Sequence, residues 1–142
     1  MKLTENLKKI LEDESLKEEF TAKLAPYIEK VDEDEVKTYI SFEIKEWMYN
    51  RRKEVQGGVI ATMFDVAMGA TANACLVEGK QVTTAGINVS YVRPLKKEKY
   101  ICVSEISNVG KTLIRVYAKI IEPETKNVMA LCTGDFVPFK DK

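Results

Sequence analysis

The sequence contains no histidine, and its 142 residues include only three cysteines. The absence of histidine excludes Ser-His-Asp and Cys-His catalysis, and it excludes the zinc sites that use histidine ligands. Acid–base chemistry must therefore rest on carboxylates, lysine, tyrosine or cysteine. Cys75, Cys102 and Cys132 lie in apolar surroundings without paired spacing, so we interpret them as buried, reduced thiols.

The chain also lacks an excess of either charge, because Lys plus Arg and Asp plus Glu both number 22. A nucleic-acid-binding surface normally shows as a basic excess, so none is expected. Charged residues interrupt the apolar stretches, and the first residues do not form a secretory signal; we expect a cytoplasmic protein without a membrane span. Residues 32–35 are four adjacent acids with no second acidic cluster. We interpret them as a solvated turn and predict no metal site and no cofactor.

The length predicts a single domain over residues 1–142. Residues 4–30 carry apolar side chains at helical spacing, with a break at residues 13–15 and Pro26 near the end. The sequence therefore predicts a helical N-terminal extension over residues 1–30. Apolar and polar side chains then alternate over residues 36–45, which is typical of a half-buried strand.

Residues 56–76 begin with two glycines and predict a helix that is apolar nearly all round, and therefore buried. Gly79 is expected to cap its C-terminal end. Asp65 is the single charged residue of the helix, and a buried carboxylate is costly unless it is paired or used. From this spacing alone, a structural and a functional role for Asp65 are equally open.

Four strands are predicted after the helix, over residues 82–93, 100–106, 112–121 and 128–137. Their short connections favour antiparallel pairing. The sequence predicts an α+β fold in which a curved antiparallel sheet wraps one long central helix, because such a sheet would explain why the helix is apolar on all sides.

Three motifs in this order resemble the hot-dog-fold thioesterases, in particular the phenylacetate-pathway (PaaI-like) acyl-CoA thioesterase group. Five residues separate Asn50 from Gln56-Gly57-Gly58, and six residues separate this glycine pair from Asp65. The segment at residues 83–94 resembles the family's strand that ends in Arg-Pro. The turn at residues 109–111 and the strand at residues 132–136 add to the resemblance.

The resemblance implies hydrolysis of an acyl- or aryl-CoA thioester to the free acid and CoA. By position, Asp65 is the carboxylate that activates water or attacks the thioester carbonyl. The backbone N–H of Gly57 is the oxyanion donor, which agrees with the need for a bare N–H at a helix N-terminus. Asn50 helps to orient the thioester or the water, and Thr84 holds the nucleophilic water.

Gln56 stands where the family usually has histidine, and it cannot titrate near neutral pH. A hot-dog protein that binds acyl-CoA with little or no turnover is therefore the alternative function. Gln56 and Gly58 are expected to contact the substrate. Of the basic residues, Arg93 and Lys111 are the preferred partners of the CoA phosphates. A dehydratase would need histidine, and a DNA-binding regulator would need a basic recognition helix.

Gly57 and Asp65 are eight residues apart, which on one helix corresponds to about 12 Å along the axis. If both act on one thioester, they must come from different subunits. We therefore predict a homodimer with a site at its interface, and the sequence leaves a homotetramer open. Asp65 is expected to lie among apolar neighbours, where burial would favour its protonated form and the partner's helix N-terminus would oppose this.

Overall fold

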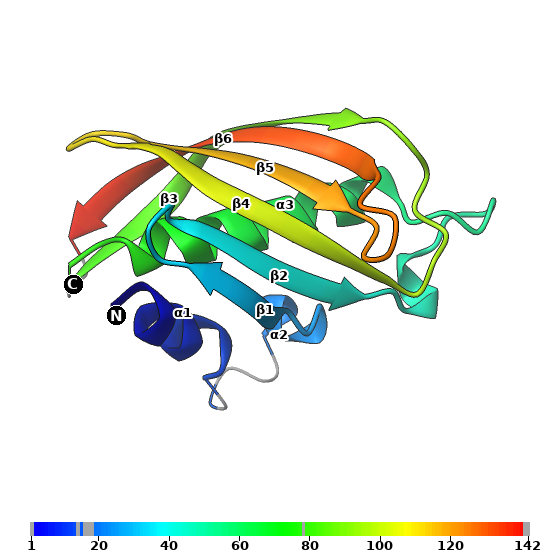
Figure 1. Ribbon diagram of the computed structural model, residues 1–142, viewed down its shortest axis with the longest axis horizontal. Helices are drawn as coiled ribbons and strands as arrows, with labels where there is room; N and C mark the ends of the chain where they lie inside the picture. The colour runs from blue at the N-terminus through cyan, green and yellow to red at the C-terminus, as the bar shows by residue number, and fades with distance from the viewer. Residues whose placement is uncertain (1, 14, 16–18, 78, 141–142) are drawn as a thin grey trace.

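The computed structural model describes residues 2–13, 15, 19–77 and 79–140. A six-stranded sheet covers the long helix α3 (Gly57–Ala74) (Figure 1). The other elements, in chain order, are α1 (Lys2–Leu11), α2 (Phe20–Lys23), β1 (Tyr27–Asp32), β2 (Lys37–Glu43), the 3₁₀ helix η2 (Glu46–Met48), β3 (Lys80–Tyr91), β4 (Lys99–Val109), β5 (Ile114–Ile121) and β6 (Val128–Lys140).

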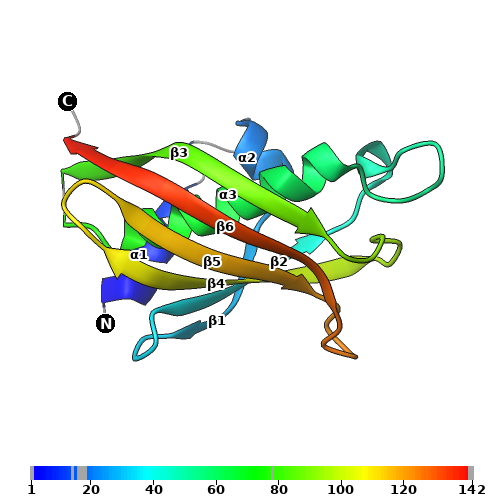
Figure 2. The same cartoon turned by 90° about the horizontal axis from the view of Figure 1, so that it is seen from above.

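The strands follow the order β1-β2-β4-β5-β6-β3, and every neighbouring pair is antiparallel. The sheet curves over α3, as the two views together show (Figures 1 and 2). β1 and β3 form its two edges. The predicted α+β fold, with a long central helix wrapped by a curved antiparallel sheet, is confirmed.

Helix α3 is buried over most of its circumference, as its apolar sequence predicts. Met63, Phe64 and Met68 are fully buried and belong to one hydrophobic cluster with Phe136 of β6. Gly134 of β6 makes room for this packing, because a Cβ there would lie 2.7 Å from Met68 Cε. The helix and the sheet therefore approach each other more closely at Gly134 than a larger residue would permit.

A pair of buried hydroxyls joins α3 to the sheet. Thr38 of β2 and Thr71 of α3 lie 2.7 Å apart at their hydroxyl oxygens, and both side chains are fully buried. Thr71 donates to the carbonyl oxygen of Ala67, so Thr38 supplies the proton of the hydroxyl pair. Both buried polar groups are thereby satisfied.

Strand β3 carries a β-bulge in its pairing with β6. Thr84 pairs with Phe136 and Gly86 pairs with Asp135, so Ala85 is one extra residue without a partner on β6.

The N-terminal extension is only partly helical. Helix α1 ends at Leu11, in agreement with the break predicted at residues 13–15, of which Glu14 lies outside the described residues. The helical prediction is wrong from Tyr27 onward, because β1 pairs there with β2. Ala25 adopts a φ of 50° just before Pro26, and the helical segment ends there. Tyr27 and Ile28, which continue the helical spacing of the sequence, pair with β2 instead.

Gly79 does not cap α3, and this prediction was wrong. The helix ends at Ala74, and its last turn tightens. The N–H groups of Cys75 and Leu76 donate to the carbonyl oxygens of Ala72 and Asn73 at 3.2 and 3.1 Å. These two hydrogen bonds satisfy terminal carbonyls of the helix without a glycine. Gly79 has a φ of 86° and lies at the entry to β3.

The acidic run lies at the turn between β1 and β2, as predicted: Asp32 ends β1, and Glu33, Asp34 and Glu35 lie in the turn. Asp32 Oδ1 accepts the N–H groups of Asp34 and Glu35 at 3.1 and 3.0 Å. Over the described ranges, no helix combines the length and hydrophobicity that crossing a bilayer requires.

Candidate active site

The N-terminus of α3 is open. Gln56 occupies the N-cap position, with a φ of −60° and a ψ of 142°, but its side chain makes no capping hydrogen bond. Its carbonyl oxygen accepts from Val59 and Ile60, so the N–H groups of Gly57 and Gly58 precede the first intrahelical bonds. A Cβ at Gly58 would meet no atom within 4 Å. The site therefore offers backbone donors at the positive end of a helix dipole.

Tyr91, the last residue of β3, fixes this end of the helix. Its hydroxyl donates to the carbonyl oxygen of Gly57 at 2.7 Å. A Cβ on Gly57 would lie 3.3 Å from the Tyr91 ring, so a larger residue would press on the tyrosine. The sequence predicted only a strand around Tyr91, and its polar contact with Gly57 was missed.

Asn50 organises the loop that precedes α3. Its side-chain oxygen accepts the N–H groups of Arg52 and Glu54 at 2.9 and 3.2 Å. Asn50 and Gly57 both line a cavity of about 320 Å³. The structure thus places Asn50 beside the expected oxyanion donor, where its oxygen holds the loop in shape.

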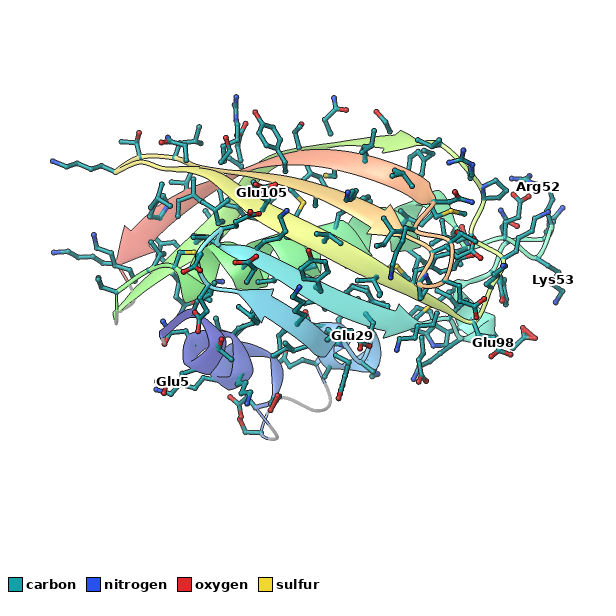
Figure 3. The ribbon with its side chains drawn as sticks, viewed as in Figure 1. Glu5, Glu29, Arg52, Lys53, Glu98 and Glu105 are labelled. Carbon is teal, nitrogen blue, oxygen red and sulfur yellow. The ribbon has the colours of Figure 1, made fainter. Side chains whose placement is uncertain are left out.

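Arg93 lines the same cavity from the segment after β3. Its guanidinium donates to the carbonyl oxygen of Val128 at 2.6 Å, which holds the side chain against the sheet. Arg52 and Lys53 project from the loop at this end of the molecule (Figure 3). The N-terminus of α3 therefore lies among several cationic groups that could meet an anionic ligand.

Asp65 and Thr84 meet in a second cavity. The Thr84 hydroxyl on β3 donates to Asp65 Oδ1 on α3 at 2.7 Å. The cavity has a volume of about 230 Å³, and both residues line it. The structure thus brings together two residues that the resemblance assigned to the chemistry.

The surroundings of Asp65 differ from the expectation. Met63, Phe64 and Met68 face the core, whereas Asp65 is half-buried and faces the cavity. Consecutive helix residues are turned by about 100°, so Met63 and Phe64, two and one positions before Asp65, point away from it and do not enclose the carboxylate.

Cys132 of β6 lies near Asp65 but is a poor candidate nucleophile. Burial raises the pKa of its thiol to about 11, and the negative charge of Asp65 adds to the shift. A thiol with this pKa is protonated at neutral pH, and only the thiolate is a strong nucleophile. Within the described part of the chain, no group of three Cys, Asp or Glu side chains could hold a metal ion.

Gly57 and Asp65 do not share a cavity within one chain. They lie at positions one and nine of α3, about 12 Å apart along the helix axis. The β4–β5 turn, which contains Lys111, lies at the opposite end of the sheet from the loop before α3 (Figures 1 and 2). Within one chain, the predicted site residues therefore form two groups, with Lys111 apart from the group around Gly57.

Sequence reasoning also left the N-terminal extension without a function. Ile10, Leu11 and Thr21 line the cavity that contains Asp65. The sequence predicted a helical extension, but no pattern in it indicated which part of α3 the extension would cover.

This fold is found in a known class of proteins. The sequence pattern of the thioesterase superfamily matches residues 55–128, which contain all of α3 and β3, and the chain belongs to this superfamily. No curated protein sequence matches the chain.

Solved structures share the fold at low sequence identity. Escherichia coli PaaI, from the phenylacetic acid degradation operon, matches with a TM-score of 0.82 and 16% identity over 99% of this chain and 96% of that chain. A Bacillus halodurans protein solved with CoA has a TM-score of 0.74 and 23% identity, over 96% of this chain and 88% of that chain. A Streptococcus mutans protein bound to acetyl-CoA has a TM-score of 0.71 and 17% identity, over 82% and 91%. The resemblance to the hot-dog thioesterases, with PaaI among the matches, is confirmed.

Proposed function

We propose that this protein hydrolyses an acyl-CoA thioester to the free acid and CoA. The observation that carries the proposal is the pair of Asp65 and Thr84. A carboxylate on a helix with no other charged residue is held by a hydroxyl at 2.7 Å and faces a cavity rather than the core. The superfamily, and the CoA ligands of two structural matches, support a thioester of CoA as the substrate.

Asp65 acts as the general base in the proposed reaction. It takes a proton from a water molecule, whose oxygen attacks the thioester carbonyl carbon while Thr84 orients the carboxylate. The negative charge that develops on the carbonyl oxygen is stabilised by the N–H of Gly57. Collapse of the intermediate breaks the carbon–sulfur bond, and the CoA thiolate leaves and takes up a proton. Attack by Asp65 itself, followed by hydrolysis of the resulting anhydride, uses the same groups.

The separation of Gly57 and Asp65 requires a second subunit. β3 is an edge strand, so its outer backbone groups can pair with another chain. Along β3, Tyr91 lies beside Gly57 of α3 and Thr84 lies beside Asp65, because each pair is joined by a hydrogen bond. Antiparallel pairing of two β3 strands about Asn88 sets Tyr91 opposite the bulge at Thr84 and Ala85. Each Gly57 would then lie at the level of the other subunit's Asp65, giving two sites per dimer.

The same arrangement gives Lys111 a role. Ile114 pairs with Phe136, and Phe136 pairs with Thr84, so the turn containing Lys111 lies just beyond the level of Thr84. In the proposed dimer, Lys111 of one subunit approaches the end where Gly57 and Arg93 of the other lie. These cations, with the exposed Gln56 and Gly58, would contact the CoA moiety. A tetramer built from two such dimers is compatible with the same site.

The alternative is a protein that binds acyl-CoA without efficient turnover. Gln56 favours it, because this residue lies at the N-cap of α3 and has no group that titrates near neutral pH. In the structure, the N–H of Gln56 donates to the carbonyl oxygen of Met48 at 2.9 Å. This backbone hydrogen bond holds the turn before Gly57 without an ionisable side chain. The turn can therefore keep its shape with glutamine at position 56, and this favours the enzyme.

The first test is release of free thiol from a panel of aliphatic and aryl acyl-CoAs by the wild type and Asp65→Asn. We expect the variant to lose at least a hundredfold in kcat/KM. Asp135→Asn is the matched control, because Asp135 is paired with Arg115 on the exposed surface. Binding of acyl-CoA without turnover on any panel member would reject hydrolysis in favour of the alternative.

The second test addresses the shared site. Asp65→Asn and Gly57→Pro homodimers are each expected to be inactive. After unfolding and refolding together, half of the dimers contain both chains, and each of these has one intact site. About a quarter of the wild-type activity is therefore expected to return. If the mixture stays inactive while mixed dimers are present, both groups must act within one chain.

A further inference from the structure

The cavity beside Asp65 is a groove that follows α3 toward its C-terminal end. Its floor includes Asp65, Gly69 and Asn73, which are spaced by one helical turn. Asn73 therefore lies about 12 Å from Asp65 along the axis. Because residues four apart share a helix face, an acyl group attached to a carbonyl at Asp65 can extend along this line.

The floor of the groove is open because its residues are small. Gly69 has no side chain, and Ala70 beside it is buried. A Cβ built on Gly69 would touch only Phe136, at an ordinary 3.5 Å. Val82 and Thr84 of β3 form one wall.

The opposite wall comes from the N-terminal extension, through Ile10, Leu11 and Thr21. The extension is anchored to the domain by the fully buried Leu7 and Leu24. It is also anchored at the far end of the groove, where Asn6 Nδ2 donates to the carbonyl oxygen of Ala74 at 2.9 Å. Helix α1 therefore packs against the C-terminal part of α3, at the end of the groove that lies farthest from Asp65 (Figure 1).

We propose that the N-terminal extension sets the length of acyl group that this protein accepts. The groove runs for about 12 Å from Asp65 to Asn73, and the extension borders it along one side. The lining of the groove combines apolar side chains, among them Ile10, Leu11 and Val66, with the polar Asp65, Asn73 and Thr84. Because α1 is attached at the far end, the groove favours acyl groups of about this length over long fatty acyl groups. This inference rests on the proposed function.

The test shortens the two apolar side chains that α1 contributes to the groove, by combining Ile10→Ala with Leu11→Ala. The ratio of kcat/KM for dodecanoyl-CoA to that for hexanoyl-CoA is expected to rise at least tenfold, since one methylene in a tight apolar pocket changes this ratio by about tenfold or more. Ile28→Ala is the matched control, because Ile28 is half-buried in β1 and outside the groove. A ratio that stays unchanged, or rises equally in the control, overturns the proposal.

Gly69→Ala tests the groove in the opposite direction. Alanine is a better helix former than glycine, so this variant is expected to fold. The added methyl narrows the floor, and kcat/KM for phenylacetyl-CoA is expected to fall severalfold while that for acetyl-CoA stays the same. Equal effects on both substrates would contradict a role of the groove in acyl selection.

Binding separates this inference from the proposed function. If the wild type hydrolyses no thioester, calorimetry with S-hexyl-CoA and S-dodecyl-CoA measures the same preference without chemistry. A shift toward the longer ligand in the Ile10 and Leu11 double variant supports the acyl groove even though hydrolysis has failed. The same relative affinity in the wild type and the variant overturns it.

Discussion

The Tyr91 hydroxyl donates a 2.7 Å hydrogen bond to the carbonyl oxygen of Gly57, so the end of β3 holds the first residue of α3. The side chain of the N-cap residue Gln56 makes no hydrogen bond to this turn. The sheet, rather than a capping side chain, therefore determines where the helix begins and where its free N–H groups point.

Replacing Tyr91 with phenylalanine tests this attachment. The variant keeps the ring and loses the hydrogen bond, so the free energy of unfolding is expected to fall by about 1 kcal/mol. The kcat is expected to fall as well, because the Gly57 N–H is then less well positioned. Urea denaturation and steady-state kinetics measure the two effects. Tyr27→Phe, at a residue that is 64% exposed on β1, should change neither.

Replacing Gly57 with proline removes one backbone N–H and leaves the helix in place. Proline is well tolerated at the first position of a helix, and the φ and ψ of Gln56, −60° and 142°, suit a residue that precedes proline. We expect kcat to fall by about a hundredfold or more, as for other oxyanion donors.

Gly57→Ala is the control for this variant, because it adds a Cβ beside Tyr91 and keeps the N–H. Its kcat should stay within about tenfold of the wild type. Equal losses in the two variants would show that the added bulk, and not the missing donor, is responsible.

The thiol of Cys102 should make the protein less stable at high pH. Burial raises its pKa to about 12 from an ordinary value of 9.0. Below pH 9 both the folded and the unfolded chain hold the proton, so this contribution to stability is complete. As the pH rises from 9 toward 12, the unfolded thiol ionises first, and the free energy of unfolding falls by at most about 1.4 kcal/mol per pH unit.

Chemical denaturation at several pH values measures this effect. The stability advantage of the wild type over Cys102→Ala should shrink steadily above pH 9. An advantage that is the same at neutral and at alkaline pH would mean that the thiol is not protected in the folded state.

Gly134→Ala should destabilise the fold by about 1 to 3 kcal/mol. The new Cβ would lie 2.7 Å from Met68 Cε and 2.9 Å from Phe136 Cε2, so two core side chains must move. Gly58→Ala adds the same methyl where no atom lies within 4 Å and should not destabilise the protein. Thermal unfolding of both variants makes the comparison.

The main elements of the fold could be predicted from periodicity. The apolar run of α3, the alternation in β2 and the turns between the last strands each follow from local sequence. The strand at Tyr27–Asp32 could not be predicted, because Tyr27 and Ile28 continue a helical spacing and only pairing with β2 makes them a strand.

The candidate site was predictable in its parts and not in its arrangement. Spacing and resemblance identified Asp65, and the structure adds its contact with Thr84. The polar role of Tyr91 depends on where β3 ends relative to α3, which no local pattern encodes. The same holds for Ile10 and Leu11, which reach the Asp65 groove only through the packing of α1.

The bulge at Ala85 determines which face of β3 carries Thr84 and Tyr91. These residues are seven positions apart, an odd number, so on a regular strand their side chains would point to opposite faces. The extra residue at Ala85 shifts the alternation of side chains by one position, so both side chains point toward α3. A single deletion at Ala85 would remove the bulge and bring the two residues six positions apart, so both side chains would still face α3 on a regular strand. A single deletion elsewhere between them, with the bulge kept, would turn one of the two contacts toward solvent.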